Sequence, residues 1–248
     1  MSVFDQLRGV VESGGRAVVL TVIAGDDVGT KLLVLEDGTT VGDGPAEVAA
    51  LAPNAIRTGR GHVIEHGGLT LFADVYGPPP RLLVYGAVDT AEALARGAKL
   101  LGWTAIVADA RATFLTRERI PSADRLVAEW PEEAIAEVAP DHQTAIVVLT
   151  HDDKFDEPAL LAALRTEAFY IGALGSRRNQ ERRRERLLEA GASETELDRI
   201  SGPCGLDIGA ETQAETALSI LAEALAARAG RAGGSLREAK QRIHAELA

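Results

Sequence analysis

The chain has one cysteine, few aromatic residues and no long apolar segment. A single cysteine, Cys204, excludes an internal disulfide framework, and we expect an ordinary buried thiol there. No apolar stretch approaches the about 20 residues of a membrane-spanning helix. Residues 1–10 lack the basic start and apolar core of a signal peptide. These absences predict a cytoplasmic protein with no membrane partner.

Positive charge is also scarce. The net charge of -11 argues against nucleic-acid binding, because release of counterions from the phosphate backbone needs a positive face. His62, His66 and His142 lack the spacing of metal ligands, so we expect no metal site. The one local concentration of positive charge is a set of five arginines: Arg177, Arg178, Arg182, Arg183 and Arg184.

Three consecutive prolines in residues 77–80 predict a spacer between two domains. Upstream of it, apolar runs and a turn at 36–39 predict a small β-rich (α+β) domain over 1–77. Its expected strands are 17–23, 31–35 and 69–75, and its expected helices are 3–12 and 45–50.

Downstream of the spacer, short apolar strands alternate with helices. Such alternation is typical of a parallel sheet with helices on both faces, so we expect a Rossmann-like α/β domain over 81–230. The expected strands are 81–85, 104–108, 144–149 and 168–171, and the expected helices are 89–101, 157–164 and 176–190. Residues 231–248 are predicted to form a loose tail that ends in a short helix.

The last long helix of that domain begins at a capping box formed by Thr212 and Glu215. Leu218, Leu221 and Leu225, with Ala222, recur at helical spacing and predict a stripe that packs on the core.

Two glycine-rich turns are the most specific features of the chain. The first, residues 170–178, contains Gly172 and Gly175 and continues into Ser176, Arg177 and Arg178. A hydroxyl and two guanidinium groups at a helix N-terminus are suited to binding a phosphate. Further along this helix, Glu181, Glu185 and Glu189 interleave with arginines, so we expect a solvated, salt-bridged face with Arg183 and Arg184 on the surface.

The second turn, residues 202–210, places Asp207 between Gly205 and Gly209. The carboxylate is suited either to a hydroxyl or guanidine-like ring edge of a ligand, or to capping nearby backbone N–H groups. Both interpretations stay open.

A turn at Gly86 follows the first strand of the second domain. It departs from a dinucleotide-binding fingerprint because Val88 stands where a second glycine would admit a pyrophosphate. Asp109 ends the next strand, where an acid could accept a ribose hydroxyl. The turn therefore supports the fold and weakens ordinary NAD binding. The alternative explanation of Gly86 is simply a tight strand-to-helix turn.

Polar residues end the other strands. His151 and Asp152 follow a buried strand, and we expect them to gather with Asp109, Arg111 and the first glycine turn at the carboxyl edge of the sheet, where such sheets bind ligands. His151 is suited to act as a base, a donor or a metal ligand, or simply as a hydrogen-bonding residue.

These motifs resemble the XdhC/CoxI family of accessory proteins for xanthine dehydrogenase and related molybdenum hydroxylases. The resemblance covers about 81–228 and is specific at 150–152, 170–178 and 205–210. It implies binding of molybdenum cofactor, as molybdopterin or its dinucleotide, and help with its maturation or insertion. It also implies three partners: a molybdenum hydroxylase apo-enzyme, a cysteine desulfurase-type sulfur donor and a second copy in a homodimer.

The chain departs from the family pattern in the first domain. A Ser-Gly-Gly-Cys-x-Glu stretch of the family corresponds to 41–47, which has no cysteine, and a Gly-Ser-x-Pro-Arg stretch is absent. Cysteine is a natural soft ligand for molybdenum. The site set implied by motifs and resemblance together is Gly86, Asp109, Arg111, His151, Asp152, Gly172, Gly175, Ser176, Arg177, Arg178, Gly205, Asp207 and Gly209.

Three functions compete. The leading hypothesis is a non-catalytic protein that binds and delivers the cofactor. The second is a nucleotide-dependent oxidoreductase with Asp109 on a ribose and His151 near the chemistry; Val88 and the lack of a donor–acceptor pair count against it. The third is an interaction protein that has lost the ligand.

Overall fold

The computed structural model describes residues 2–150 and 152–239. They form two compact units, one containing residues up to Pro78 with 234–239, the other containing 79–233. Within these described stretches, every helix is too short or too polar to span a bilayer.

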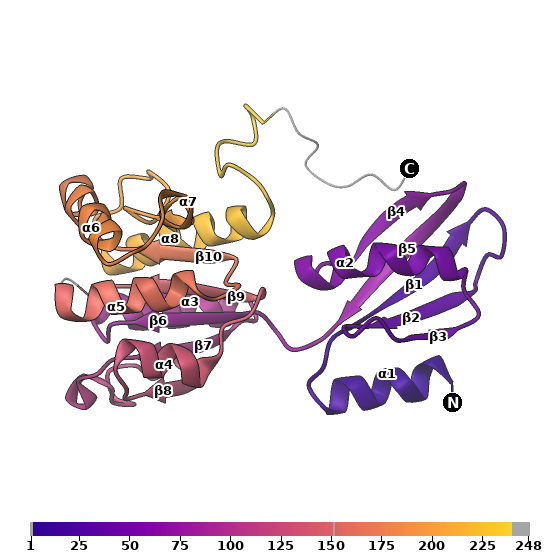
Figure 1. Cartoon of the computed structure of the whole chain (residues 1–248), viewed down its shortest axis with the longest axis horizontal. Helices are drawn as coiled ribbons and strands as arrows, with labels where there is room; N and C mark the ends of the chain where they lie inside the picture. Colours follow the sequence, from indigo (N-terminus) through magenta and orange to yellow (C-terminus); the bar gives the residue numbers. More distant parts are fainter. Residues whose placement is uncertain (1, 151, 240–248) are drawn as a thin grey trace. The chain divides into compact units, whose positions relative to one another are not determined.

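The first unit is a five-stranded antiparallel sheet in the order β3-β2-β1-β5-β4 (Figure 1). Three strands lie where the sequence predicts them, and the turn at 36–39 joins β2 to β3 as expected. The edge strand β4 was not predicted, because its residues are all half-buried or exposed. The strands are β1 (Ala17–Ala24), β2 (Lys31–Leu35), β3 (Thr40–Gly42), β4 (His62–His66) and β5 (Leu69–Tyr76).

Helices cover both faces of this sheet because side chains alternate along each strand. Val18 and Leu20 pack toward helix α2 (Ala52–Thr58), whereas Ala17 and Val19 pack toward helix α1 (Val3–Glu12). The helix predicted at 45–50 is a 3-10 turn, η1 (Ala46–Leu51), and the α-helix begins after it, with a proline in its first turn.

The second unit is a six-stranded parallel sheet in the order β11-β10-β9-β6-β7-β8. This is the doubly wound order, in which successive strands are added outward in one direction from β6 and in the other direction from β9, so the strand order reverses between β6 and β9. The predicted fold class is confirmed. The strands are β6 (Arg81–Tyr85), β7 (Thr104–Ala108), β8 (Arg125–Val127), β9 (Thr144–Val148), β10 (Tyr170–Ala173) and β11 (Ile200–Ser201).

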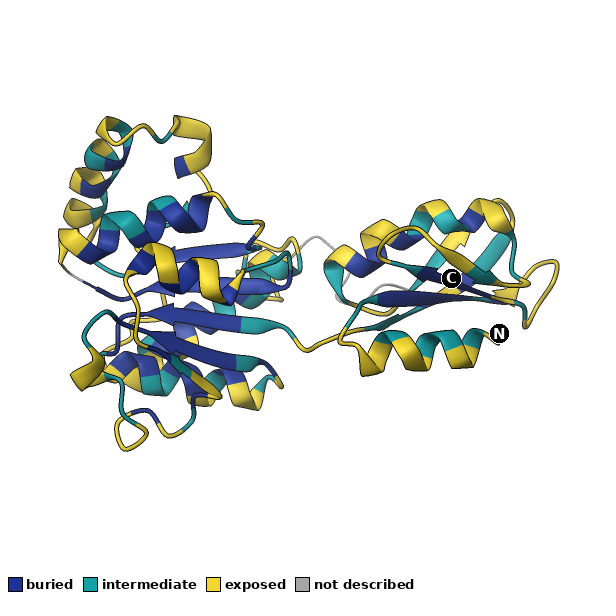
Figure 2. Cartoon of the chain, turned by 60° about the horizontal axis from the view of Figure 1, so that its bottom comes forward, coloured by how far each residue is buried: buried dark blue, intermediate teal, exposed yellow. Residues whose placement is uncertain are grey.

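Two apolar cores lie on opposite faces of the parallel sheet, and its central strands β6, β7, β9 and β10 are mostly dark blue in Figure 2. Helices α3 (Asp89–Leu100) and α8 (Gln213–Arg228) contribute to one core. The other core involves α4 (Pro131–Val138), α5 (Asp153–Leu164), α6 (Arg177–Glu189) and α7 (Glu194–Leu197). A short 3-10 turn, η2 (Ala112–Phe114), follows β7.

Several predicted details of this unit were wrong. Helix α5 begins one turn before the expected 157, because Asp152 caps it by accepting from the N–H of Lys154. Leu218 is 63% exposed, so the predicted stripe is wrong there, whereas Leu221 is buried and Leu225 packs on the core as predicted. Ala217, Ile220 and Ala224 complete the buried face of α8. Strand β8 and helix α4 were missed. The final short helix would fall largely in 240–248, outside the described residues.

Candidate functional site

The switch point of the sheet lies between the ends of β6 and β9. Gly86 adopts a φ of +116°, and a Cβ there would lie 3.1 Å from Thr150 Cγ2, so only glycine fits this close approach. Val88 occupies the N-cap of α3 without a side-chain hydrogen bond. The two strand ends are therefore packed directly against each other at the place where such folds bind ligands.

Asp109, at the end of β7, is 1% exposed and fully engaged. Its Oδ1 accepts from the N–H and Nε of Arg111, each at 2.9 Å, and its Oδ2 accepts from Arg111 Nη2 and Ala87 N at 2.9 Å. Burial alone would raise the pKa of Asp109, but these hydrogen bonds outweigh it and hold the pKa below its usual value. The carboxylate thus anchors Arg111 rather than facing solvent.

The first glycine turn ends at the N-terminus of α6. Ser176 is the N-cap and accepts from Asn179 N at 3.3 Å. Arg177 and Arg178 are exposed, and neither guanidinium has a hydrogen bond or ion pair with a described residue. Gly175 has a φ of +140°, which lets the chain turn into the helix. This set, Gly175 to Arg178, is called the anion cradle below.

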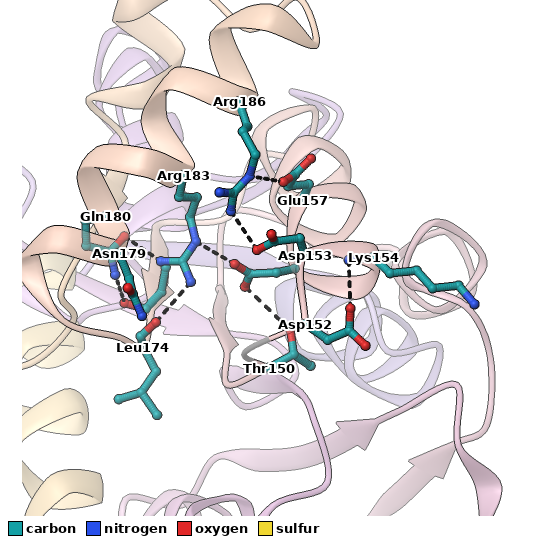
Figure 3. A network of polar contacts seen from close by, with 12 residues as sticks. Thr150, Asp152, Asp153, Lys154, Glu157, Leu174, Asn179, Gln180, Arg183 and Arg186 are labelled. Carbon is teal, nitrogen blue, oxygen red and sulfur yellow. Dashed lines mark hydrogen bonds and ion pairs between the residues drawn. The ribbon is translucent and has the colours of Figure 1, made fainter.

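Beneath the cradle lies a buried ion pair that the sequence analysis missed. Arg183 was expected on the surface, but it is 4% exposed, and its Nε donates to Asp156 Oδ2 at 2.5 Å. Its Nη2 donates to the carbonyl of Leu174 at 3.1 Å, and its Nη1 donates to Gln180 (Figure 3). Arg183 therefore ties α6 to α5 and to the glycine turn.

Two further arginines of α6 pair with other helices rather than with glutamates of their own helix. Arg186 contacts Asp153 and Glu157 of α5, and Arg184 contacts Glu194 and Asp198 of the next helix. The predicted charged face is therefore exposed or half-buried and carries ion pairs as expected, but the partners of Arg184 and Arg186 lie on neighbouring helices, and Arg183 alone is buried.

A cavity of about 220 Å³ opens between the first turn of α5 and the first three turns of α6. Three of its lining side chains are arginines and two are aspartates paired with them. Its volume suits a phosphate or another small polar group rather than a whole cofactor. The lining residues are Asp153, Asp156, Asn179, Arg182, Arg183 and Arg186.

The second glycine turn packs on α8. The N–H of Gly205 donates to Glu223 Oε2 at 2.8 Å, and the Tyr170 hydroxyl donates to the same carboxylate. Gly205 must be glycine, since a Cβ would lie 2.4 Å from Ser219 Oγ. Asp207 and Gly209 are exposed, and Asp207 makes no hydrogen bond to the described residues, so the capping interpretation is not supported. Gly172 is buried, with a Cβ position 2.7 Å from the Tyr170 ring.

Cys204 lies beside this cluster. Burial, together with the Glu223 carboxylate, raises the pKa of its thiol to about 12. We expect iodoacetamide at pH 8 to label Cys204 about a thousandfold more slowly in the folded protein than in urea, because the thiolate is the reactive form. Mass spectrometry of timed samples measures both rates, and folded and unfolded rates within tenfold of each other would contradict the expectation.

His151 lies outside the described residues. Asp152 is exposed at the N-cap of α5, and with Asp109 it helps to raise the pKa of Arg111. In the described part of the chain, no three His, Cys, Asp or Glu side chains are grouped as a metal site.

A second surface is centred on Arg111, which the sequence predicted as a site residue, whereas its aromatic neighbours and Lys154 were not predicted. Phe114, Trp130, Lys154 and Phe155 surround Arg111 at the ends of β7, β8 and β9, and we call these five residues the aromatic–cation shelf. Arg111 lies over the rings of Phe114 (4.7 Å) and Phe155 (5.5 Å), and Lys154 lies over Trp130 (4.6 Å). The residues are far apart in sequence, so only the folded sheet brings them together.

A doubly wound parallel sheet with helices on both faces defines a Rossmann-like α/β domain. The chain belongs to the XdhC family, since the model of the XdhC Rossmann domain matches residues 82–224. The strongest motifs of the sequence lie inside this range.

Curated relatives agree with this assignment. The chain is 31% identical over 186 residues to the molybdenum cofactor insertion chaperone PaoD of Escherichia coli, covering 75% of this chain and 50% of PaoD. It is 34% identical over 151 residues to a protein of Bacillus subtilis described as a probable xanthine dehydrogenase component, covering 61% and 44%. An uncharacterized protein of E. coli, YqeB, is 33% identical over 171 residues, covering 68% and 31%. The chain thus spans half or less of these relatives.

Among solved structures, a xanthine dehydrogenase from Bacillus halodurans superimposes with a TM-score of 0.68 at 23% identity, covering 91% of this chain and 66% of that one. At this identity the likeness concerns the fold alone.

Proposed function

We propose that this protein binds molybdenum cofactor as cargo and assists its maturation or insertion into a molybdenum hydroxylase of the xanthine dehydrogenase type. The observation that carries the proposal is the anion cradle, where two guanidinium groups, unpaired among the described residues, flank a capped helix N-terminus on a rigid base. Membership of the XdhC family and similarity to an insertion chaperone support the choice of cargo.

The donor set fits one end of that cargo. Molybdopterin carries a phosphate, and its dinucleotide form carries a pyrophosphate. Backbone N–H groups at the start of α6, the Ser176 hydroxyl, and Arg177 and Arg178 are the groups that a phosphate prefers. The adjoining cavity of about 220 Å³ admits the phosphate but leaves the pterin along the edge of the sheet.

The contacts of Arg183 explain how the N-terminus of α6 stays accessible to a ligand. Arg183 holds the Leu174 carbonyl and Gln180 while it is itself neutralised by Asp156. The carbonyl oxygen before the helix is thereby turned inward, and the N-terminus of α6 is left for an incoming anion. Such preorganisation lowers the ordering cost of binding.

The oxidoreductase alternative finds less support. Both oxygens of Asp109 are used by Arg111 and the Gly86 turn, so this acid has no free lone pair directed to a ribose hydroxyl at the end of β7. Delivery of a bound cofactor needs no acid–base pair, so the proposed function does not require Asp109 to act as a base or a ribose ligand.

Anaerobic titration of the purified chain with molybdopterin tests the proposal, followed by absorbance and native mass spectrometry. We expect a stoichiometric complex, and faster activation of an apo molybdenum hydroxylase by the loaded chain than by free cofactor. Absence of pterin binding together with clear NAD(P) binding would overturn the proposal in favour of the oxidoreductase, and binding of neither would favour an interaction protein.

A further inference from the structure

The aromatic–cation shelf shares no residue with the anion cradle, and it lies at the same, carboxyl edge of the sheet. Trp130 is the N-cap of α4 after β8, Phe114 ends η2 after β7, and Phe155 and Lys154 begin α5 after β9. In a doubly wound sheet, the loops after these strands flank the crevice in which ligands bind.

The shelf exposes apolar rings at this crevice. Trp130 is 46% exposed and Phe114 is 39% exposed. The rings and cations form one continuous chain of contacts, since Trp130 also packs on Phe155 with centroids 5.4 Å apart. A buried tyrosine supports the shelf from below, because the Tyr85 hydroxyl donates to the carbonyl of Glu129 at 3.3 Å.

The side chain of Arg111 is fixed in position by its contacts. Asp109 binds it through Nε and Nη2, and Phe114 and Phe155 lie against its guanidinium. Its Nη1 makes no hydrogen bond to a described residue, and the side chain is 40% exposed. One edge of a fixed guanidinium is therefore available to an oxygen ligand.

Exposed rings for stacking beside fixed cations are the two elements that recognise a nucleotide. We propose that the aromatic–cation shelf binds a nucleotide, with the base stacked on the rings and a phosphate on Arg111 and Lys154. The chemistry suits two sources, a free nucleotide and the nucleotide part of a dinucleotide cofactor. Binding of the nucleotide part of a dinucleotide cofactor rests on the function proposed above, whereas binding of a free nucleotide does not.

Calorimetric titration of the full chain with CMP, GMP and AMP, and with cytidine as the probe without phosphate, tests the shelf. We expect saturable binding of the nucleotides and weaker binding of cytidine. Trp130→Ala and Arg111→Ala should each lower nucleotide affinity about tenfold, because stacking and charged hydrogen bonds are lost. Unchanged thermal midpoints show that the exposed Trp130 variant folds.

Matched controls lie elsewhere on the chain. Phe72 is 39% exposed, as Phe114 is, but belongs to the first unit, and Arg96 is an exposed arginine on α3. Phe72→Ala and Arg96→Ala should bind nucleotides as the unsubstituted protein does. Tryptophan fluorescence gives a second measurement: nucleotides should quench Trp130, and the residual emission of buried Trp103 in Trp130→Phe should not respond.

Parallel titrations with molybdopterin and its cytosine dinucleotide separate the sources. If the shelf holds the nucleotide part of the cargo, the dinucleotide binds more tightly than molybdopterin, and Trp130→Ala removes the difference. If it takes a free nucleotide, CMP and molybdopterin bind together without competition and the dinucleotide has no advantage. If no nucleotide binds, or if Trp130→Ala binds nucleotides as tightly as the unsubstituted protein, the proposed nucleotide site is wrong, even where molybdopterin binds. Nucleotide binding without any pterin binding supports the shelf and overturns the cargo assignment.

Discussion

Replacing Arg183 by methionine is expected to lower the free energy of unfolding of the second unit by about 3–5 kcal/mol. Asp156 is 2% exposed and would keep a buried carboxyl without its cationic partner. For a unit of this size, the thermal midpoint should fall by about 10 °C. Trp103 and Trp130 both lie in the second unit, so tryptophan fluorescence follows its unfolding specifically.

The loss should depend on pH in a defined direction. Burial raises the pKa of Asp156, and the Arg183 guanidinium opposes the rise. In Arg183→Met the folded-state pKa of Asp156 lies well above its unfolded value of about 3.9, so the folded state binds the extra proton. Stability then falls as the pH rises through that folded-state pKa. The variant should lose more stability at pH 8 than at pH 5, with nearby Asp153 adding to the effect and Arg186 reducing it.

Three further variants test whether the loss of stability in Arg183→Met comes from the unpaired, buried carboxylate of Asp156. Asp156→Asn leaves an arginine that stays charged, so its loss of stability should not change between pH 5 and 8. The double variant Arg183→Met with Asp156→Leu should regain most of the loss, because no buried charge remains. Arg184→Ala removes an exposed ion pair of the same helix and should cost less than about 1 kcal/mol. A small, pH-independent loss in Arg183→Met would show that the pair contributes little.

The layers of the fold could be predicted from the sequence, but the buried face of each helix could not always be predicted. Apolar runs located most strands, because buried parallel strands need continuous apolar residues. Arg183 of α6 was wrongly assigned to the surface, since alternating Glu and Arg along one helix resemble a fully solvated face. The distinguishing signal was Leu187, which is four residues after Arg183 and therefore on the same, buried side.

The candidate site was predictable only in part. The cradle is contiguous in sequence, so its residues could be read directly from the glycine turn. Asp156 and Arg183 come from two helices, and Phe114, Trp130 and Phe155 follow three different strands, so their proximity depends on the strand order. That order cannot be obtained from alternation alone, because the same elements fit more than one doubly wound arrangement.

Alanine at both Arg177 and Arg178 is expected to lower the affinity for molybdopterin about a hundredfold, because each guanidinium supplies charged hydrogen bonds worth about tenfold. Both side chains are exposed and unpaired among the described residues, so the thermal midpoint should not change. Calorimetry in low salt measures the affinities, and the salt dependence should be shallower in the variant because part of the electrostatic attraction is gone.

A control variant and a control ligand distinguish direct contacts with the phosphate from general electrostatic attraction. Arg165 is an exposed arginine at the C-cap of α5, at the opposite end of that helix from the cavity, and Arg165→Ala alters net charge without touching the cradle. It should retain nearly full affinity. A pterin lacking the phosphate should bind the unsubstituted chain and the Arg177→Ala, Arg178→Ala variant equally weakly. If that ligand still distinguishes them, the arginines contact another part of the cargo, and the phosphate must be sought at the ends of β6 and β9, where Gly86 meets Thr150.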